Sequence, residues 1–149
     1  MKILDSPKLE QKIYLYESGK TFAILHYHEG KKEGEQLYFY QNGQLKSEYS
    51  FHNYLLEGLC LFYWSNGKLK KSAFYKNGLL DGEVINYNDL GSLIENLNYK
   101  NGQLEGLQSY FFASGPLQRQ DVYKNGLVIE RKQLSVNGDV LRHDKVNNT

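Results

Sequence analysis

Glycine recurs along this chain at a fixed interval of 24 residues. One series is Gly34, Gly58, Gly82 and Gly106, and a second is Gly19, Gly43, Gly67, Gly91 and Gly115. A third series keeps the interval at Gly30, Gly78, Gly102 and Gly126 but has Tyr54 at its second position. Aromatic residues follow the same interval at 27, 51, 75, 99 and 123, and again at 39, 63, 87 and 111. Such a period indicates one supersecondary unit stacked several times, so function must be sought on the surface of the array.

Each unit reads as a β-hairpin. The segment from Gly58 to Asp81 holds two Asn-Gly pairs, at 66–67 and 77–78, each flanked by apolar-rich runs of strand length. Asn-Gly predicts a type I′ turn, which needs positive φ at both central residues. Sibling pairs fall at 42–43, 101–102, 125–126 and 137–138, with looser turns at 89–91 and 114–115. Thirteen Tyr, seven Phe and fourteen Gly against two Pro also favour strands and tight turns. The sequence predicts an all-β fold, an elongated antiparallel meander or solenoid of stacked 24-residue hairpins.

The chain is expected to form a single domain over residues 1–149. Residues 10–33 form an N-terminal cap repeat in which Glu10 stands where the entering glycine would be. Full repeats are expected at 34–57, 58–81, 82–105 and 106–129, a partial repeat at 130–141, and a polar, fraying tail at 142–149. Terminal repeats of such arrays are expected to be atypical because one edge meets water.

Alternation along the strands predicts two faces of different character. The expected core face has Leu37, Phe39, Leu61, Tyr63, Ile85, Tyr87 and Phe111, continued by Leu45, Leu69, Leu93 and Leu117, by the column from Phe51 to Tyr123, and by Leu56, Leu80, Leu104 and Val128 at the connecting turns. The opposite face is uneven and has Tyr38, Tyr40, Phe62, Trp64, Phe74, Asn86, Asn88, Asn96, Asn98, Tyr110 and Phe112. Exposed Tyr and Trp are common anchors of protein interfaces, and Asn supplies adaptable polar contacts. The uneven face is therefore either a second structural layer or the partner-binding surface.

The repeat unit resembles a known family. GLCLFYWSNGKLKKSAFYKNGLLDG and GEQLYFYQNGQLKSEYSFHNYLLEG share a glycine entry, paired aromatics, two turn signals and an acidic residue before the next glycine. This pattern resembles MORN repeats, and more closely the bacterial variant of the YwqK-type antitoxin family, over residues 10–141. The resemblance implies a protein-binding scaffold, and in bacterial members an antitoxin or immunity protein beside a toxin. Eukaryotic MORN proteins instead resemble scaffolds that bind proteins or have been linked to phospholipids. Departures at Tyr54, Asn88, Asp121 and Val122 leave the fold unchanged but argue against a uniform ligand surface.

Composition narrows the classes of partner. The formal net charge is +1, so no large field attracts nucleic acid or an anionic membrane. The single Cys60 gives no internal disulfide framework and fits a reducing compartment. No apolar segment approaches membrane-spanning length, and no signal core opens the chain. We expect a cytoplasmic protein that is a monomer until it binds a cognate protein, with signal-less export left open.

Catalytic and cofactor chemistry has little support in the residues. No motif joins a histidine to a nucleophile, and His26 and His28 lack further metal ligands, so neither catalytic, cofactor nor metal residues are assigned. Glu33, Glu57, Asp81 and Glu105 form a column that suits turn solubility and edge protection better than catalysis. Lys76, Lys100 and Lys124 fit solvated turns. The sequence predicts a non-enzymatic binding module whose partner surface is formed by Tyr38, Tyr40, Phe62, Trp64, Phe74, Asn86, Asn88, Tyr110 and Phe112.

Overall fold

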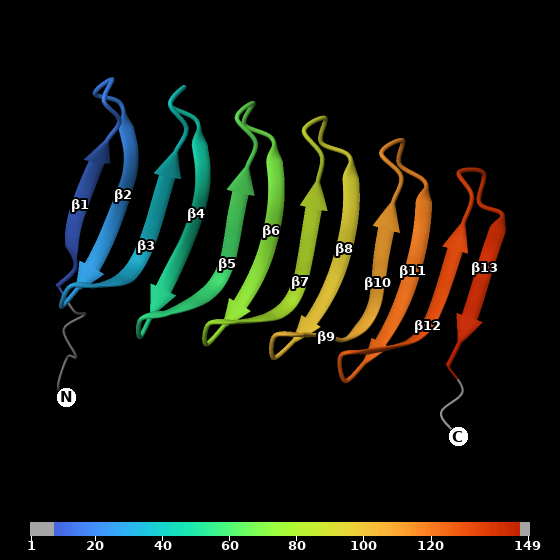
Figure 1. Ribbon diagram of the computed structural model, residues 1–149. Coiled ribbons are helices and arrows are strands. Elements are labelled where there is room, and N and C mark those ends of the chain that lie inside the picture. Colours follow the sequence, from blue (N-terminus) through green and yellow to red (C-terminus); the bar gives the residue numbers. More distant parts are fainter. Residues whose placement is uncertain (1–7, 147–149) are drawn as a thin grey trace, which may run out of the picture.

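The computed structural model describes residues 8–146 as one open antiparallel sheet (Figure 1). Its strands are β1 (Glu10–Leu15), β2 (Thr21–His28), β3 (Lys31–Phe39), β4 (Leu45–His52), β5 (Leu55–Tyr63), β6 (Leu69–Lys76), β7 (Leu79–Tyr87), β8 (Leu93–Lys100), β9 (Gln103–Leu104), β10 (Gly106–Phe111), β11 (Leu117–Lys124), β12 (Leu127–Leu134) and β13 (Val140–Lys145). Strands adjacent in sequence pair side by side, except that β9 is a short piece that pairs only with β8. The prediction of an all-β meander of hairpins is confirmed.

Two different turns alternate along the edges of the sheet. At one edge the short turns have positive φ at both central residues, 50° at Asn77 and 79° at Gly78, as a type I′ turn requires. At the other edge only the glycine does: Gly67 has φ 83°, and the loop closes through Trp64 N–H to the Lys68 carbonyl at 2.8 Å. The type I′ prediction is therefore confirmed at 77–78, 101–102 and 125–126 and wrong at 42–43, 66–67 and 137–138. At 42–43 and 66–67 the Asn side chain accepts a hydrogen bond within a longer loop, as Asn66 does from Lys68 N–H at 3.0 Å. At 137–138 the Ser135 hydroxyl accepts from the backbone amides of Asn137 and Asp139 instead.

Strand pairing defines which residues share a face. Tyr38 lies opposite Ser47, and Gln36 lies opposite Tyr49, so these four residues define what we call the Tyr38 face. The neighbouring residue Leu37 defines the other side, the Leu37 face.

A β-bulge just after each long loop breaks the alternation along the strand. Phe62 pairs with Lys71 but Tyr63 pairs with Leu69, which leaves Lys70 as the extra residue. Leu69 therefore remains with Tyr63 on the Leu37 face, whereas Tyr75 lies opposite Gly58 on the Tyr38 face. The expectation that the column from Phe51 to Tyr123 joins the face of Leu37 is wrong, because it assumed unbroken alternation through this bulge.

The most buried side chains lie on the Tyr38 face. Ala23, Cys60, Ala73 and Val84 are at most 2% exposed there. The expected core face from Leu37 to Phe111 is only half-buried, so that expectation is also wrong. The physical reason is that the sheet is a single layer, and larger side chains on either side keep part of their surface in water while small central ones are covered. Polar residues join the buried column at Gln36, Gln108 and Asp121.

The C-terminal hairpin departs from the repeat phase. Ala73 pairs with Val84 and Tyr75 with Leu80, whereas the corresponding pairs in the last hairpin are Asp121 with Arg131 and Tyr123 with Val128. Its bulge is one residue shorter because Glu130 occupies the position held by positive-φ glycines in earlier repeats. Arg131 consequently lies opposite Asp121.

The last strand also runs further than predicted. β13 continues to Lys145, so the expected tail at 142–149 is wrong for residues 142–145, and residues 147–149 lie outside the described part.

Candidate binding surface

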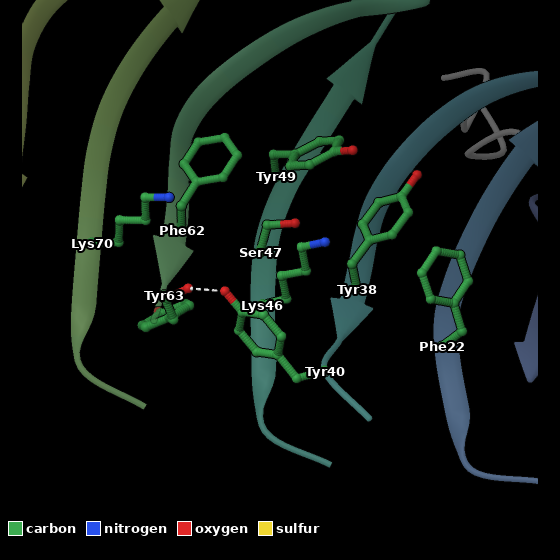
Figure 2. Close-up of a pocket in the computed structure, with 9 residues that line it drawn as sticks. All are labelled: Phe22, Tyr38, Tyr40, Lys46, Ser47, Tyr49, Phe62, Tyr63 and Lys70. Atoms are coloured by element: carbon green, nitrogen blue, oxygen red, sulfur yellow. Dashed lines mark hydrogen bonds between the residues drawn. The ribbon is translucent and has the colours of Figure 1, made fainter. Parts of the chain in front are cut away.

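An aromatic cluster crosses the Tyr38 face from β2 to β5. Tyr38 contacts Phe22 edge-on at a ring-centroid distance of 5.9 Å and stacks on Tyr49 at 5.8 Å. Tyr49 in turn lies 6.3 Å from Phe62. These rings border a hollow of about 330 Å³ that opens on the sheet face, as Figure 2 shows. Four neighbouring strands thus present one continuous aromatic surface.

Lysines lie over the rings of this surface. Lys32 Nζ donates to the Tyr38 hydroxyl at 2.8 Å. Lys46 and Lys70 border the hollow (Figure 2). Their ammonium groups lie 5.6 Å from the Tyr40 ring centroid and 4.3 Å from the Trp64 ring centroid, respectively. Lys71 lies 5.9 Å from the Phe62 centroid. Burial raises the pKa of the Tyr38 hydroxyl, but its hydrogen bonds with Lys32 and Tyr49 outweigh that effect, and the net pKa is lowered.

The carboxylates of the same strands lie elsewhere. Glu35 and Glu48 are on the Leu37 face, opposite Ser50 and Leu37. Glu48 accepts a hydrogen bond from the Tyr63 hydroxyl at 2.6 Å, and desolvation together with this bond raises the pKa of Tyr63 to about 12. The carboxylates of Glu33 and Glu57 bind backbone amides of the short turns. The two faces of β3–β6 therefore differ in charge although the whole chain is nearly neutral.

The structure brings together only part of the predicted partner surface. Tyr38, Phe62, Asn86 and Tyr110 share the Tyr38 face by strand pairing. Phe74 lies opposite Leu59 on the Leu37 face, where it is 42% exposed. Asn96 and Asn98 are also on the Leu37 face, opposite Ile85 and Glu83. The expectation that all these residues share one face is wrong for Phe74, Asn96 and Asn98, for the same reason of interrupted alternation.

Tyr40 and Trp64 connect consecutive repeats. The Tyr40 hydroxyl donates to the Tyr63 carbonyl at 2.8 Å, and Trp64 Nε1 donates to the Tyr87 carbonyl at 3.1 Å. Tyr16 makes the same bond to Phe39 at 2.7 Å. We call this series the loop ladder.

The next two positions of the series, Asn88 and Phe112, are different. The Asn88 side-chain oxygen accepts from the Leu90 and Ser92 amides of its own loop, and Phe112 has no side-chain donor. Tyr40 and Trp64 therefore have a structural role besides any contact with a partner.

Sequence reasoning missed an ion cluster in the C-terminal repeats. The Asp121 side chain is fully buried and receives two hydrogen bonds of 2.8 Å from the Arg131 guanidinium. Arg119 lies 3.4 Å from the same carboxylate and 3.9 Å above the Tyr110 ring. The pKa of Arg131 is raised by the hydrogen bonds to Asp121. The sequence did carry one indication of this cluster: Asp121 is a charged residue in a 24-residue series whose earlier members are Tyr49, Ala73 and Leu97.

The candidate reactive groups have structural partners. Burial raises the pKa of the Cys60 thiol to about 11, which disfavours the nucleophilic thiolate. His26 Nδ1 donates to the Glu35 carbonyl at 2.6 Å, and its Nε2 lies 3.1 Å from the Gln11 amide nitrogen. The His28 ring stacks on Tyr54. These three groups belong to the packing of the sheet.

Fold and surface together define a repeat protein made of stacked β-hairpins, with a cluster of aromatic rings on one face of its sheet. The family model of the MORN repeat variant matches residues 32–53, 56–77 and 80–101. Three consecutive units of the chain are therefore similar to repeats of that variant, which are found in generally non-catalytic binding scaffolds. The comparison with curated proteins returned no match. No helix within residues 8–146 is long and apolar enough to cross a membrane.

Proposed function

We propose that this chain is a non-catalytic module that binds another protein through the Tyr38 face of β2–β6. One observation supports this proposal above others: aromatic rings from four strands border an open hollow on a sheet face that no second layer of the described residues covers. Large aromatic side chains supply most of the buried area at protein interfaces and lose little conformational entropy on binding.

The rings are held in place before any partner arrives. Tyr38 is fixed by stacking on Tyr49 and by the hydrogen bond from Lys32, and Phe62 packs beside Tyr49. A surface whose side chains are already ordered loses less conformational entropy on association. Trp64 and Tyr40 border this area but also belong to the loop ladder, so Tyr38 and Phe62 are the better probes of binding.

The partner in this proposal is a cognate toxin, and the chain is its antitoxin or immunity protein. The resemblance of the repeat unit to the bacterial antitoxin variant supports this more specific role. In this proposal the protein is cytoplasmic and stays a monomer until it binds its partner. The alternative is a general MORN scaffold that organises signalling, cytoskeletal or membrane-associated proteins. A captured toxin would arrest growth when expressed alone and would be neutralised when this chain is expressed with it. A partner without that property would favour the general scaffold.

A matched pair of variants tests the binding face. Phe62 and Phe74 lie on neighbouring strands but on opposite faces. Tagged wild type, Phe62→Ala and Phe74→Ala would each be used to capture partners from the native lysate, after circular dichroism has shown that all three remain folded. We expect Phe62→Ala to weaken capture of the main partner by about tenfold or more, the effect of losing one interface anchor. Phe74→Ala should capture it normally. Equal capture by all three proteins would contradict the proposal.

A further inference from the structure

Charge is segregated across the sheet in its N-terminal half. Lys32, Lys46, Lys70 and Lys71 all gather on the Tyr38 face, each within 6 Å of a ring centroid. All four carboxylates of β3–β6 lie on the Leu37 face or at the short turns. The aromatic hollow therefore has a local positive charge that the net charge of +1 conceals.

The position of the lysines restricts the class of ligand. Proteins that bind single-stranded nucleic acid stack bases on free aromatic faces. Here Lys70 covers the Trp64 ring at 4.3 Å, and the rings of Tyr38 and Tyr49 stack on each other. One face of each of these three rings is therefore not open to a base, whereas the ammonium groups can still donate to a carboxylate from their outer side.

The dimensions suit a short extended segment. Four steps between the five neighbouring strands β2 to β6, at about 4.8 Å each, span about 19 Å. An extended chain that rises about 3.3 Å per residue would cross this distance in about six residues. Alternate side chains of such a segment point in opposite directions, so an apolar side chain can enter the hollow while acidic neighbours reach the lysines at its border.

We propose that the segment docking on the Tyr38 face is an acidic, extended protein segment with alternating apolar side chains, recognised by Lys32, Lys46, Lys70 and Lys71 around the hollow between Tyr38 and Phe62. This inference rests on the proposed function and names the chemistry of its partner. The opposite charges set the selectivity and the association rate, and the aromatic hollow supplies the buried apolar area.

A defined probe tests this inference on the full chain. The probe is a fluorescent peptide of about eight residues in which Glu alternates with Leu around one Phe, and its control has Lys in place of every Glu. Anisotropy titrations should show binding of the acidic peptide, none of the basic one, and weaker binding as salt is raised. The double variant Lys70→Gln with Lys71→Gln should bind the acidic peptide about tenfold more weakly than wild type. Lys100→Gln with Lys124→Gln, the same charge change at two short turns, should stay within about twofold of wild type.

Three results would overturn the inference: no binding of the acidic peptide, equal losses in both lysine pairs, or tighter binding of oligothymidylate or phosphatidylserine vesicles than of the peptide. Capture of the native partner separates this inference from the proposed function. If Phe62→Ala weakens capture but the Lys70 and Lys71 variant does not, the face binds the partner and its acidic chemistry is wrong. If neither affects capture, the proposed function itself fails.

Discussion

The Glu57 carboxylate accepts a hydrogen bond from the backbone amide of Asn77 at 2.7 Å, and so ties one short turn to the strand of the preceding repeat. The same bond recurs at equivalent positions: Glu33 accepts from Asn53 and Tyr54, Asp81 from Asn101, and Glu105 from Asn125. A column of carboxylates that sequence reasoning assigned to solubility and edge protection therefore caps the turns of neighbouring repeats.

Removing one of these caps should lower stability. We expect Glu57→Ala to reduce the free energy of unfolding by about 1 kcal/mol, because a charge-assisted hydrogen bond to a turn amide is lost at a largely exposed site. Glu35→Ala, at an exposed position on the Leu37 face, is the control and should change it by less than about 0.5 kcal/mol. Urea denaturation of both variants measures the difference. Equal stability of Glu57→Ala and wild type would show that the cap contributes nothing.

Tyr54 occupies a turn position that favours glycine. Its φ is 64°, in the left-handed region, while Gly78 and Gly102 hold the corresponding position in the following turns. Tyr54→Gly should raise the free energy of unfolding by about 0.5 to 1 kcal/mol. The reason is that the backbone strain removed from the folded state exceeds the stabilisation of the unfolded chain by the conformational entropy of glycine. Thermal melts check the direction. The reverse change, Gly78→Tyr, should lower the melting temperature, and a gain there would refute the argument from strain.

Loss of Arg131 should leave a buried charge poorly compensated. We expect Arg131→Ala to cost about 2 kcal/mol of unfolding free energy, because the fully buried Asp121 would keep only Arg119, at 3.4 Å. The double variant with Asp121→Ala should lose less than the sum of the single losses, since the unpaired charge is then gone. A double-mutant cycle by chemical denaturation measures the coupling. Additive losses would mean that the two residues do not stabilise each other.

Alkaline pH should destabilise the sheet. Burial raises the pKa of Cys60 from 9.0 to about 11, and burial and Glu48 raise the pKa of Tyr63 from 10.0 to about 12. Between these values the unfolded chain releases protons that the folded chain keeps, so the free energy of unfolding should fall as pH rises above about 9. Urea midpoints measured from pH 8 to 11 test this. Cys60→Ala should show a shallower fall, and an identical slope would contradict the role of the thiol.

The aromatic column at Tyr75 and Tyr99 should make a moderate contribution to the free energy of unfolding. Both rings are half-buried on the Tyr38 face, so Tyr75→Ala should cost about 2 kcal/mol, below the range for a fully buried ring. Lys100→Ala, at an exposed strand end, should have little effect. Calorimetry of the two variants tests this ranking. A melting temperature of Tyr75→Ala within a degree or two of wild type would show that this column contributes little.

The period of 24 residues was sufficient to predict the hairpins and their order, because the Asn-Gly pairs and the series from Gly19 to Gly115 mark chain reversals by local conformational preference alone. The series from Gly34 to Gly82 lies within strands instead. The faces were not predictable in the same way. The side on which Tyr75 or Phe74 lies depends on a bulge at Lys70, and a bulge is an outcome of pairing between strands that no single run of residues reveals.

The candidate site shows the same limit. Tyr38 and Phe62 were identified from their residue type and spacing, and the structure places them on one face. The clustering of lysines was hidden because acidic residues alternate with them along the chain and separate only across the sheet. The Asp121 cluster forms because Glu130 stands where earlier repeats have a glycine. This replacement shifts the strand register and brings Arg131 opposite Asp121.

The loop ladder gives the array a mechanical polarity. Tyr16, Tyr40 and Trp64 each clamp the loop edge of their own hairpin to the next one, while Asn88 and Phe112 leave that edge unclamped. Neighbouring hairpins contact mainly each other, so such a sheet opens from whichever end resists least. Under tension the C-terminal hairpins should peel away first, while the N-terminal hairpins that form the aromatic hollow stay together.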